Sequence, residues 1–114
     1  MLVGEFAAIM DYELTQADMA QNEIDIRGCY IGDLLSNVMG NAKAGQLWLT
    51  VMTNINVVAV AQLLELSGIV LLEGNRIDND VLLRARMENI PVFLSKDQAY
   101  EAAVKLSGSG LIKA

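Results

Sequence analysis

Three short polar segments of this 114-residue chain carry side chains that could bind a ligand. They are Thr53–Asn56, Glu73–Arg76 and Ser95–Asp97, and each follows an apolar run that is typical of a buried strand. In an open parallel sheet such corners meet at the carboxyl edge, where ligands bind and where helix N-termini can hold an anion. The three segments therefore predict a site for a small anionic ligand at that edge.

The same residue types also have a simpler explanation. Asn, Ser, Asp and Gly are the ordinary capping and turn residues at the ends of strands and the starts of helices. Arg76 is different, because a turn does not require an arginine. The ligand-binding candidates are Asp33, Thr53, Asn54, Asn56, Glu73, Gly74 and Arg76.

Catalytic signatures are absent from the sequence. The chain has no histidine and a single cysteine, Cys29, which excludes histidine-based triads, the common zinc sites and an intrachain disulfide. Asp78–Asp80 lacks the glycine and the distal glutamate of a calcium loop, so helix capping explains it better. We therefore predict no catalytic residue, no metal ligand and no cofactor; an enzyme would have to use Asp33, Glu73 or Arg76.

The stretch from Gly45 to Gly74 positions two of the polar corners. It reads as a strand at Leu47–Met52, a helix at Val57–Leu66 and a second strand at Ile69–Leu72. Two strands joined through a helix of this length are normally parallel neighbours with a right-handed crossover. The predicted fold class is α/β, a single compact domain with a mainly parallel sheet and flanking helices.

The rest of the chain supplies further expected elements. Before the central unit we expect a helix at Leu2–Met10, a brief strand at Tyr12–Gln16 and a loop at Ala17–Glu23. A strand at Ile24–Ile31 should follow, and then a helix at Leu34–Met39 that Asp33 caps and Gly40–Asn41 ends. After it we expect a helix from the N-cap Asp78 to Asn89, a strand at Val92–Leu94, and a helix with a Ser95–Gln98 capping box that Gly108 ends. The domain would span residues 1–107, with a flexible tail at 108–114.

The central helix is apolar on every face of its first turns. A helix on the surface of a small monomer should show a polar stripe, and none occurs before Gln62. Either the N-terminal segment of the chain buries this helix or a second copy of the protein does, and we favour the second copy. The dimer-interface candidates are Val57, Val58, Val60 and Ala61.

Composition restricts the possible partners. Apolar residues make up 54% of the chain and charged residues 19%, and the net charge is −6. The eight basic residues do not cluster in the sequence, which disfavours nucleic acid and anionic membrane as partners. No apolar run reaches the roughly 18 residues of a membrane span, and Met1–Met10 lacks the basic start of a signal peptide. We expect a cytoplasmic protein.

The run Tyr30–Met39, with Trp48–Thr50 and Asn56–Ala61 behind it, resembles the DRTGG domain family, which is similar to the N-terminal domain of HPr kinase/phosphorylase. The likeness extends to Ile90–Val92, and the Gly-Asp-Leu-Leu-Ser sequence beginning at Gly32 is its most specific part. The resemblance implies a compact α/β fold of that kind. The naming motif itself differs: Thr53-Asn54 replaces Asp-Arg, and Glu73-Gly74-Asn75 replaces Thr-Gly-Gly.

The resemblance also implies a class of function. Members of the family are accessory modules of some phosphotransacetylases and, with CBS domains, of regulated inorganic pyrophosphatases; stand-alone bacterial or archaeal members occur near iron-only hydrogenase components. Our hypothesis is a non-catalytic regulatory or ligand-sensing domain that acts as a homodimer and binds a nucleotide or a phosphorylated metabolite. The alternative is an adaptor that docks on a redox (hydrogenase-type) or signalling enzyme. Ligand binding by the isolated protein separates the two.

Overall fold

A five-stranded sheet in the order β1-β5-β4-β3-β2 forms the centre of the computed structural model, which describes residues 1–15 and 23–110. Neighbours from β2 to β5 pair in parallel, and β1 pairs antiparallel with β5 at one edge. The strands are β1 (Glu13–Leu14), β2 (Gly28–Ile31), β3 (Gln46–Thr50), β4 (Gly68–Leu71) and β5 (Val92–Leu94).

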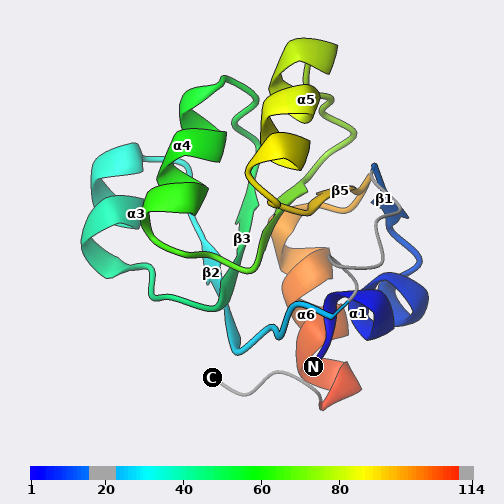
Figure 1. Ribbon diagram of the computed structural model, residues 1–114. Helices are drawn as coiled ribbons and strands as arrows, with labels where there is room; N and C mark the ends of the chain where they lie inside the picture. The colour runs from blue at the N-terminus through cyan, green and yellow to red at the C-terminus, as the bar shows by residue number, and fades with distance from the viewer. Residues whose placement is uncertain (16–22, 111–114) are drawn as a thin grey trace.

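Helices cover both faces of this sheet (Figure 1). On one face lie three helices that connect the parallel strands, namely α3 (Leu35–Asn41), α4 (Asn56–Leu63) and α5 (Asn79–Met87). On the other face lie the first and last helices, α1 (Val3–Met10) and α6 (Ala99–Ser109). The described part of the chain thus forms a three-layer α/β domain, which confirms the predicted fold class.

Alternation along the central strands divides the core into two halves. Trp48 of β3 faces the layer of α3, α4 and α5, and its indole N–H donates to the Gly32 carbonyl at 2.9 Å. Leu47 and Leu49 point the opposite way, toward α1 and α6, where Phe6 also meets Phe93 edge to face at 4.9 Å. Because both faces are covered, β3 and β4 are apolar apart from Gln46 and Thr50 at the two ends of β3, as buried parallel strands are.

Several predicted boundaries were wrong. The strand expected at Ile24–Ile31 begins only at Gly28, although Asp25 makes an isolated bridge with Leu2. Helix α3 continues through Gly40 and Asn41 without left-handed backbone, and the Asn41 side-chain amide donates to the Asn37 backbone carbonyl at 2.8 Å. Most of the loop expected at Ala17–Glu23 lies outside the described residues.

The last helix also differs from the prediction at both ends. Its N-cap is Gln98, whose backbone N–H donates to the Glu101 carboxylate, so Ser95 does not begin a capping box. The helix continues through Gly108 to Ser109 and ends at Gly110, which has a left-handed φ of 69°. The expected tail therefore begins as helix, and residues 111–114 lie outside the described part.

The apolar central helix is explained by the chain's own core. Helix α4 packs against α5 and the sheet, and the other residues of that half of the core cover its apolar side. Side chains that contact a second copy would have to be exposed on the single chain. All four dimer-interface candidates are buried instead, so the predicted dimer interface on α4 is corrected: Val57, Val58, Val60 and Ala61.

Candidate functional site

Two of the three polar corners are joined by backbone hydrogen bonds. The Glu73 N–H donates to the Asp97 carbonyl and the Gly74 N–H donates to the Ser95 carbonyl, both at 2.9 Å. Glu73 and Gly74 both adopt left-handed backbone, with φ of 61° and 73°, which turns the chain sharply after β4. The conformation suits glycine and strains a glutamate. The corners after β4 and β5 are thus held side by side at the carboxyl edge of the sheet.

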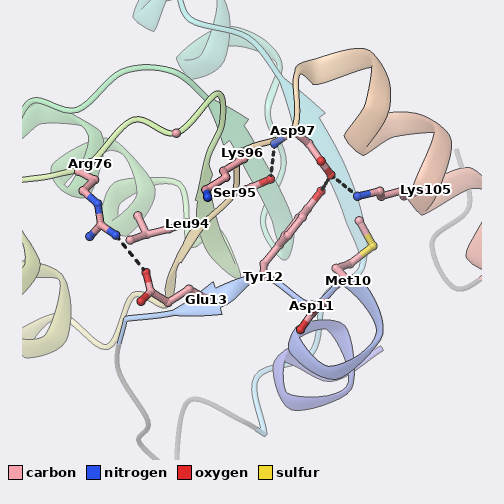
Figure 2. Close-up of a pocket in the computed structure, with 11 residues that line it drawn as sticks. Met10, Asp11, Tyr12, Glu13, Arg76, Leu94, Ser95, Lys96, Asp97 and Lys105 are labelled. Carbon is pink, nitrogen blue, oxygen red and sulfur yellow. Dashed lines mark hydrogen bonds and ion pairs between the residues drawn. The ribbon is translucent and has the colours of Figure 1, made fainter.

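A cavity of about 510 Å³ opens beside these corners. One wall is the connection from α1 to β1, Met10–Glu13, and another is the end of β5 with the corner behind it, Leu94–Asp97. Gly74 and Arg76 contribute from the corner after β4, and Lys105 contributes from α6 (Figure 2). Segments from the start, the middle and the end of the chain therefore form one pocket.

Three cationic side chains line this pocket. Arg76, Lys96 and Lys105 come from three different segments, and they are three of the eight basic residues in the chain. The Arg76 guanidinium lies 3.8 Å from the Glu13 carboxylate, with both side chains largely exposed, so this pair is weak. Among the described residues, Lys96 has no ion-pair partner. Two of the three cations are thus available to an incoming anion.

Asp97 organises the opposite side of the pocket. Its Oδ2 accepts a hydrogen bond from the Tyr12 hydroxyl at 2.7 Å and another from the Lys105 ammonium at 2.6 Å (Figure 2). The hydrogen bond from Lys105 holds the pKa of the Asp97 carboxyl below its usual value. Burial, together with the hydrogen bond to Asp97, raises the pKa of Tyr12. At neutral pH this side therefore holds an ionised carboxylate and a neutral hydroxyl.

The predicted candidates divide into two groups. Gly74 and Arg76 line the pocket, and Glu73 belongs to the same corner, although its exposed side chain is not part of the lining. The remaining candidates follow β2 and β3 and do not line it; they are Asp33, Thr53, Asn54 and Asn56. A ligand role for any of the seven stays a prediction.

Asp33 has a different structural role from the predicted one. The N-cap of α3 is Leu34, and the Asp33 carboxylate instead accepts from the Thr50 hydroxyl at 2.7 Å and from the Val51 N–H at 2.9 Å. It thus ties the end of β2 to the end of β3. Beyond β3, the Asn54 side chain accepts from the Asn56 N–H at 2.9 Å, an ordinary turn contact that supports the capping explanation there.

Sequence reasoning did not select Tyr12, Glu13 or Lys105. Tyr12 and Glu13 enter the site because β1 runs antiparallel beside β5. This pairing involves only two residues of β1, and no local sequence pattern predicts it. Lys105 of α6 bonds Asp97, which lies just before the N-cap Gln98, and no local spacing rule predicts a contact between residues eight apart. Across residues 1–15 and 23–110, no three His, Cys, Asp or Glu side chains gather as they would to bind a metal ion.

Comparison with solved structures finds a known structure with this fold. The chain aligns with the crystal structure of the CBS and DRTGG domains of the regulatory region of Clostridium perfringens pyrophosphatase, complexed with its activator, diadenosine tetraphosphate. The TM-score is 0.76, and the alignment covers 98% of this chain and 50% of that one. The two share a fold. At 10% identity the likeness extends to the fold alone.

Comparisons of sequence give no further assignment. No protein-family model matches the chain, and no curated protein matches it. The structural likeness supports a DRTGG-like fold, as the resemblance implied, and membership of the family itself stays a prediction. None of the described helices is both long enough and apolar enough to span a bilayer.

Proposed function

We propose that this protein is a non-catalytic regulatory domain that acts as a homodimer and senses a nucleotide or another phosphorylated metabolite in the pocket between the β4 and β5 corners. One observation carries the ligand part of the proposal: Arg76, Lys96 and Lys105 converge on a single cavity. Phosphate groups are recognised by charge-assisted hydrogen bonds from Arg and Lys, and these are about twice as strong as neutral ones.

The pocket is richer in cations than the rest of the chain, which supports an anionic ligand. The whole chain carries −6, yet the pocket combines three cations with three carboxylates, those of Asp11, Glu13 and Asp97. Since Lys105 is held by Asp97 and Arg76 only loosely by Glu13, a phosphate would bind first to Arg76 and Lys96. The Gly74 backbone leaves this approach open, because a glycine presents no side chain.

The size of the cavity fits a small metabolite. Its volume of about 510 Å³ lies within the range of pockets that hold drug-sized molecules. The regulatory region, half of which aligns with this chain, was crystallised with a nucleotide activator, diadenosine tetraphosphate. Nucleotides are therefore the first ligands to test on this chain.

Sensing would work through the segments that the pocket joins. A phosphate on Arg76 would displace Glu13, which belongs to the two-residue strand β1 at the edge of the sheet. Strand β1 pairs with β5 over only two residues, so a change at Glu13 can shift the balance between docked and released arrangements of the edge. The signal of ligand binding would be a changed protein surface at the β1 edge of the sheet, and it needs no covalent step.

The side chains of the pocket favour binding over catalysis. Tyr12 is held neutral by its raised pKa, and Asp97 is already occupied by two donors. Cys29 lies at the far strand, β2, and burial raises its pKa to about 11, which keeps the thiol protonated at pH 7. The described lining offers no activated base or nucleophile.

Native mass spectrometry tests the proposal with a defined panel: AMP, ADP, ATP, diadenosine tetraphosphate and acetyl phosphate. We expect the protein to retain at least one of these, and the Lys96→Gln variant to retain markedly less of it. Lys43→Gln removes an exposed lysine from the turn before β3 and is the matched control. No retention of any member by the unmodified protein would contradict the proposal.

A second candidate function is that of an adaptor for a redox or signalling enzyme. It is favoured by large apolar side chains that α4 and the start of α3 expose, since Leu63 is 67% and Leu34 62% accessible. This function needs no small ligand. A protein that binds no member of the panel, and that loses a defined enzyme partner on Leu63→Asp substitution, would establish it.

A further inference from the structure

The free cations of the pocket match the charge of a single phosphate monoester. Asp97 holds Lys105 at 2.6 Å, which leaves Arg76 and Lys96 as the cations that an incoming anion can reach. A phosphate monoester carries about 1.5 to 2 negative charges at pH 7, because its second pKa is about 6. The guanidinium and the ammonium therefore neutralise one such group. A second phosphate finds no further free cation in the described lining.

The wall formed by the connection from α1 to β1 adds negative charge to the pocket. Asp11 and Glu13 line it, and both residues are exposed. In the part of the chain that the structure describes, Asp11 makes no ion pair and Glu13 makes only the weak one with Arg76. A chain of phosphates that continued from Arg76 through the cavity would meet these carboxylates, and like charges repel.

The same two carboxylates are suited to hydroxyl groups. An ionised carboxylate accepts hydrogen bonds and donates none, so Asp11 and Glu13 can bind a ligand hydroxyl. Glu13 lies only 3.8 Å from the Arg76 guanidinium. A phosphate on Arg76 therefore brings the adjoining part of the ligand close to this carboxylate, and a hydroxyl there would replace the partner that Glu13 loses.

We propose that the pocket selects a phosphate monoester of a polyhydroxyl compound, a nucleoside monophosphate or a sugar phosphate, and discriminates against di- and polyphosphates. The phosphate binds Arg76 and Lys96, and the hydroxyl groups bind Glu13 and Asp11. This inference rests on the proposed ligand-sensing function and narrows it to one class of ligand.

The expected discrimination is moderate, because solvent screens the charges. The side chains of Arg76 and Glu13 are 76% and 61% exposed, and Lys96 is also exposed. One charge pair at such a position changes affinity by roughly 1.5- to fivefold. Because salt screens exposed charges, the preference for a monophosphate should also shrink as the ionic strength rises.

Isothermal titration calorimetry with AMP, ADP and ATP tests the charge argument, since these ligands differ only in their number of phosphates. At low salt and without Mg²⁺, AMP should bind about three- to tenfold more tightly than ATP, with ADP between them. The difference should shrink at about 0.5 M salt. ATP that binds as tightly as AMP, or more tightly, would overturn the inference and leave the proposed function standing. No binding of any of the three or of ribose 5-phosphate would overturn both.

A substitution at Glu13 tests its part in the discrimination. Glu13→Gln keeps the size of the side chain and removes its charge, so the preference for AMP over ATP should fall by about threefold. Glu65→Gln is the matched control, because Glu65 is exposed and lies outside the pocket. It should leave the preference unchanged. A Glu13→Gln protein with the preference of the unmodified protein would overturn the role of this carboxylate.

Two further ligands test the hydroxyl contacts. 2′,3′-Dideoxyadenosine 5′-monophosphate lacks the ribose hydroxyls and should bind about threefold more weakly than AMP. Equal binding of the two would overturn the acceptor role of Asp11 and Glu13. Ribose 5-phosphate keeps the phosphate and hydroxyls without the base. Binding as tight as that of AMP would identify sugar phosphates as the ligand class, and weaker binding would identify nucleoside monophosphates.

Discussion

The Tyr12 hydroxyl donates a hydrogen bond of 2.7 Å to the carboxylate of Asp97, across 85 positions of the sequence. The same oxygen, Oδ2, accepts from Lys105 at 2.6 Å, and the Lys105 ammonium lies 5.9 Å from the centre of the Tyr12 ring. One carboxylate thus connects the segment before β1, the corner after β5 and helix α6.

Replacement of Asp97 by Asn should reduce stability in a way that depends on pH. Because the pKa of Asp97 is lowered in the folded state, its stabilising contribution is complete above the unfolded pKa of about 3.9 and is lost as the pH falls through the folded value. We expect a loss of about 1–3 kcal/mol at pH 7 that shrinks below about pH 4.

Urea unfolding of both proteins at pH 7, 5, 4 and 3 measures this difference. Tyr12→Phe is the control, since it removes one donor and leaves the carboxylate; it should cost about 1 kcal/mol. A difference between Asp97→Asn and the unmodified protein that stays constant down to pH 3 would show that the ionised carboxylate is not what stabilises the corner.

Asp33→Ala should destabilise the protein through the contact between β2 and β3, without fraying helix α3. The variant loses the acceptor for the Thr50 hydroxyl and the Val51 N–H, and Thr50 is buried. We expect a loss of about 1–2 kcal/mol. A double-mutant cycle with Thr50→Val should show coupling, and strictly additive losses would instead indicate that the two residues act independently.

Two glycine substitutions should have opposite effects on stability. Gly74→Ala introduces a side chain at a φ of 73° and should destabilise by about 1 kcal/mol. Gly40→Ala changes a helical position of α3 with open space around it and should stabilise by up to about 1 kcal/mol. Thermal unfolding of both variants compares the signs. A stabilising Gly74→Ala would be incompatible with the corner geometry described above.

Val58→Asp should prevent folding. The Val58 side chain is 1% exposed within the core between α4 and the sheet, and a buried unpaired carboxylate costs several kcal/mol. Leu63→Asp changes an exposed position of the same helix and should remain folded. Circular dichroism and light scattering distinguish the two. A Val58→Asp protein that still folds would contradict the burial of this side chain in the core, and one that is monomeric where the unmodified protein is dimeric would place a dimer surface on this side of α4.

The sequence predicted the fold better than the site. The prediction for the unit from Gly45 to Gly74 was correct, because three buried segments in succession leave little choice of architecture. The alternation of Leu47, Trp48 and Leu49 adds only which half of the core each side chain joins. The apolar character of α4 was misinterpreted. A short helix packed between a sheet and neighbouring helices has few exposed positions, and the sequence alone does not show how many neighbours cover it.

The pocket depended on contacts that local patterns do not encode. Arg76 was singled out because a turn does not need it, and it does line the cavity. Tyr12 and Glu13 could not be assigned to the site, because they enter it through the antiparallel pairing of a two-residue strand with β5. Asp33 was mistaken for a cap because an aspartate before a helix is usually one, whereas here the neighbouring strand offers two donors.

Isothermal titration calorimetry with the same nucleotide and acetyl phosphate panel tests the central claim most directly. The unmodified protein, Lys43→Gln and Arg27→Gln should bind one member of the panel equally well, since both substituted residues lie outside the pocket. Lys96→Gln and Arg76→Gln should each weaken that binding by about tenfold, the value of one charge-assisted hydrogen bond. Binding that neither pocket variant weakens, or no binding of any member to the unmodified protein, would contradict a phosphate-sensing role for this site.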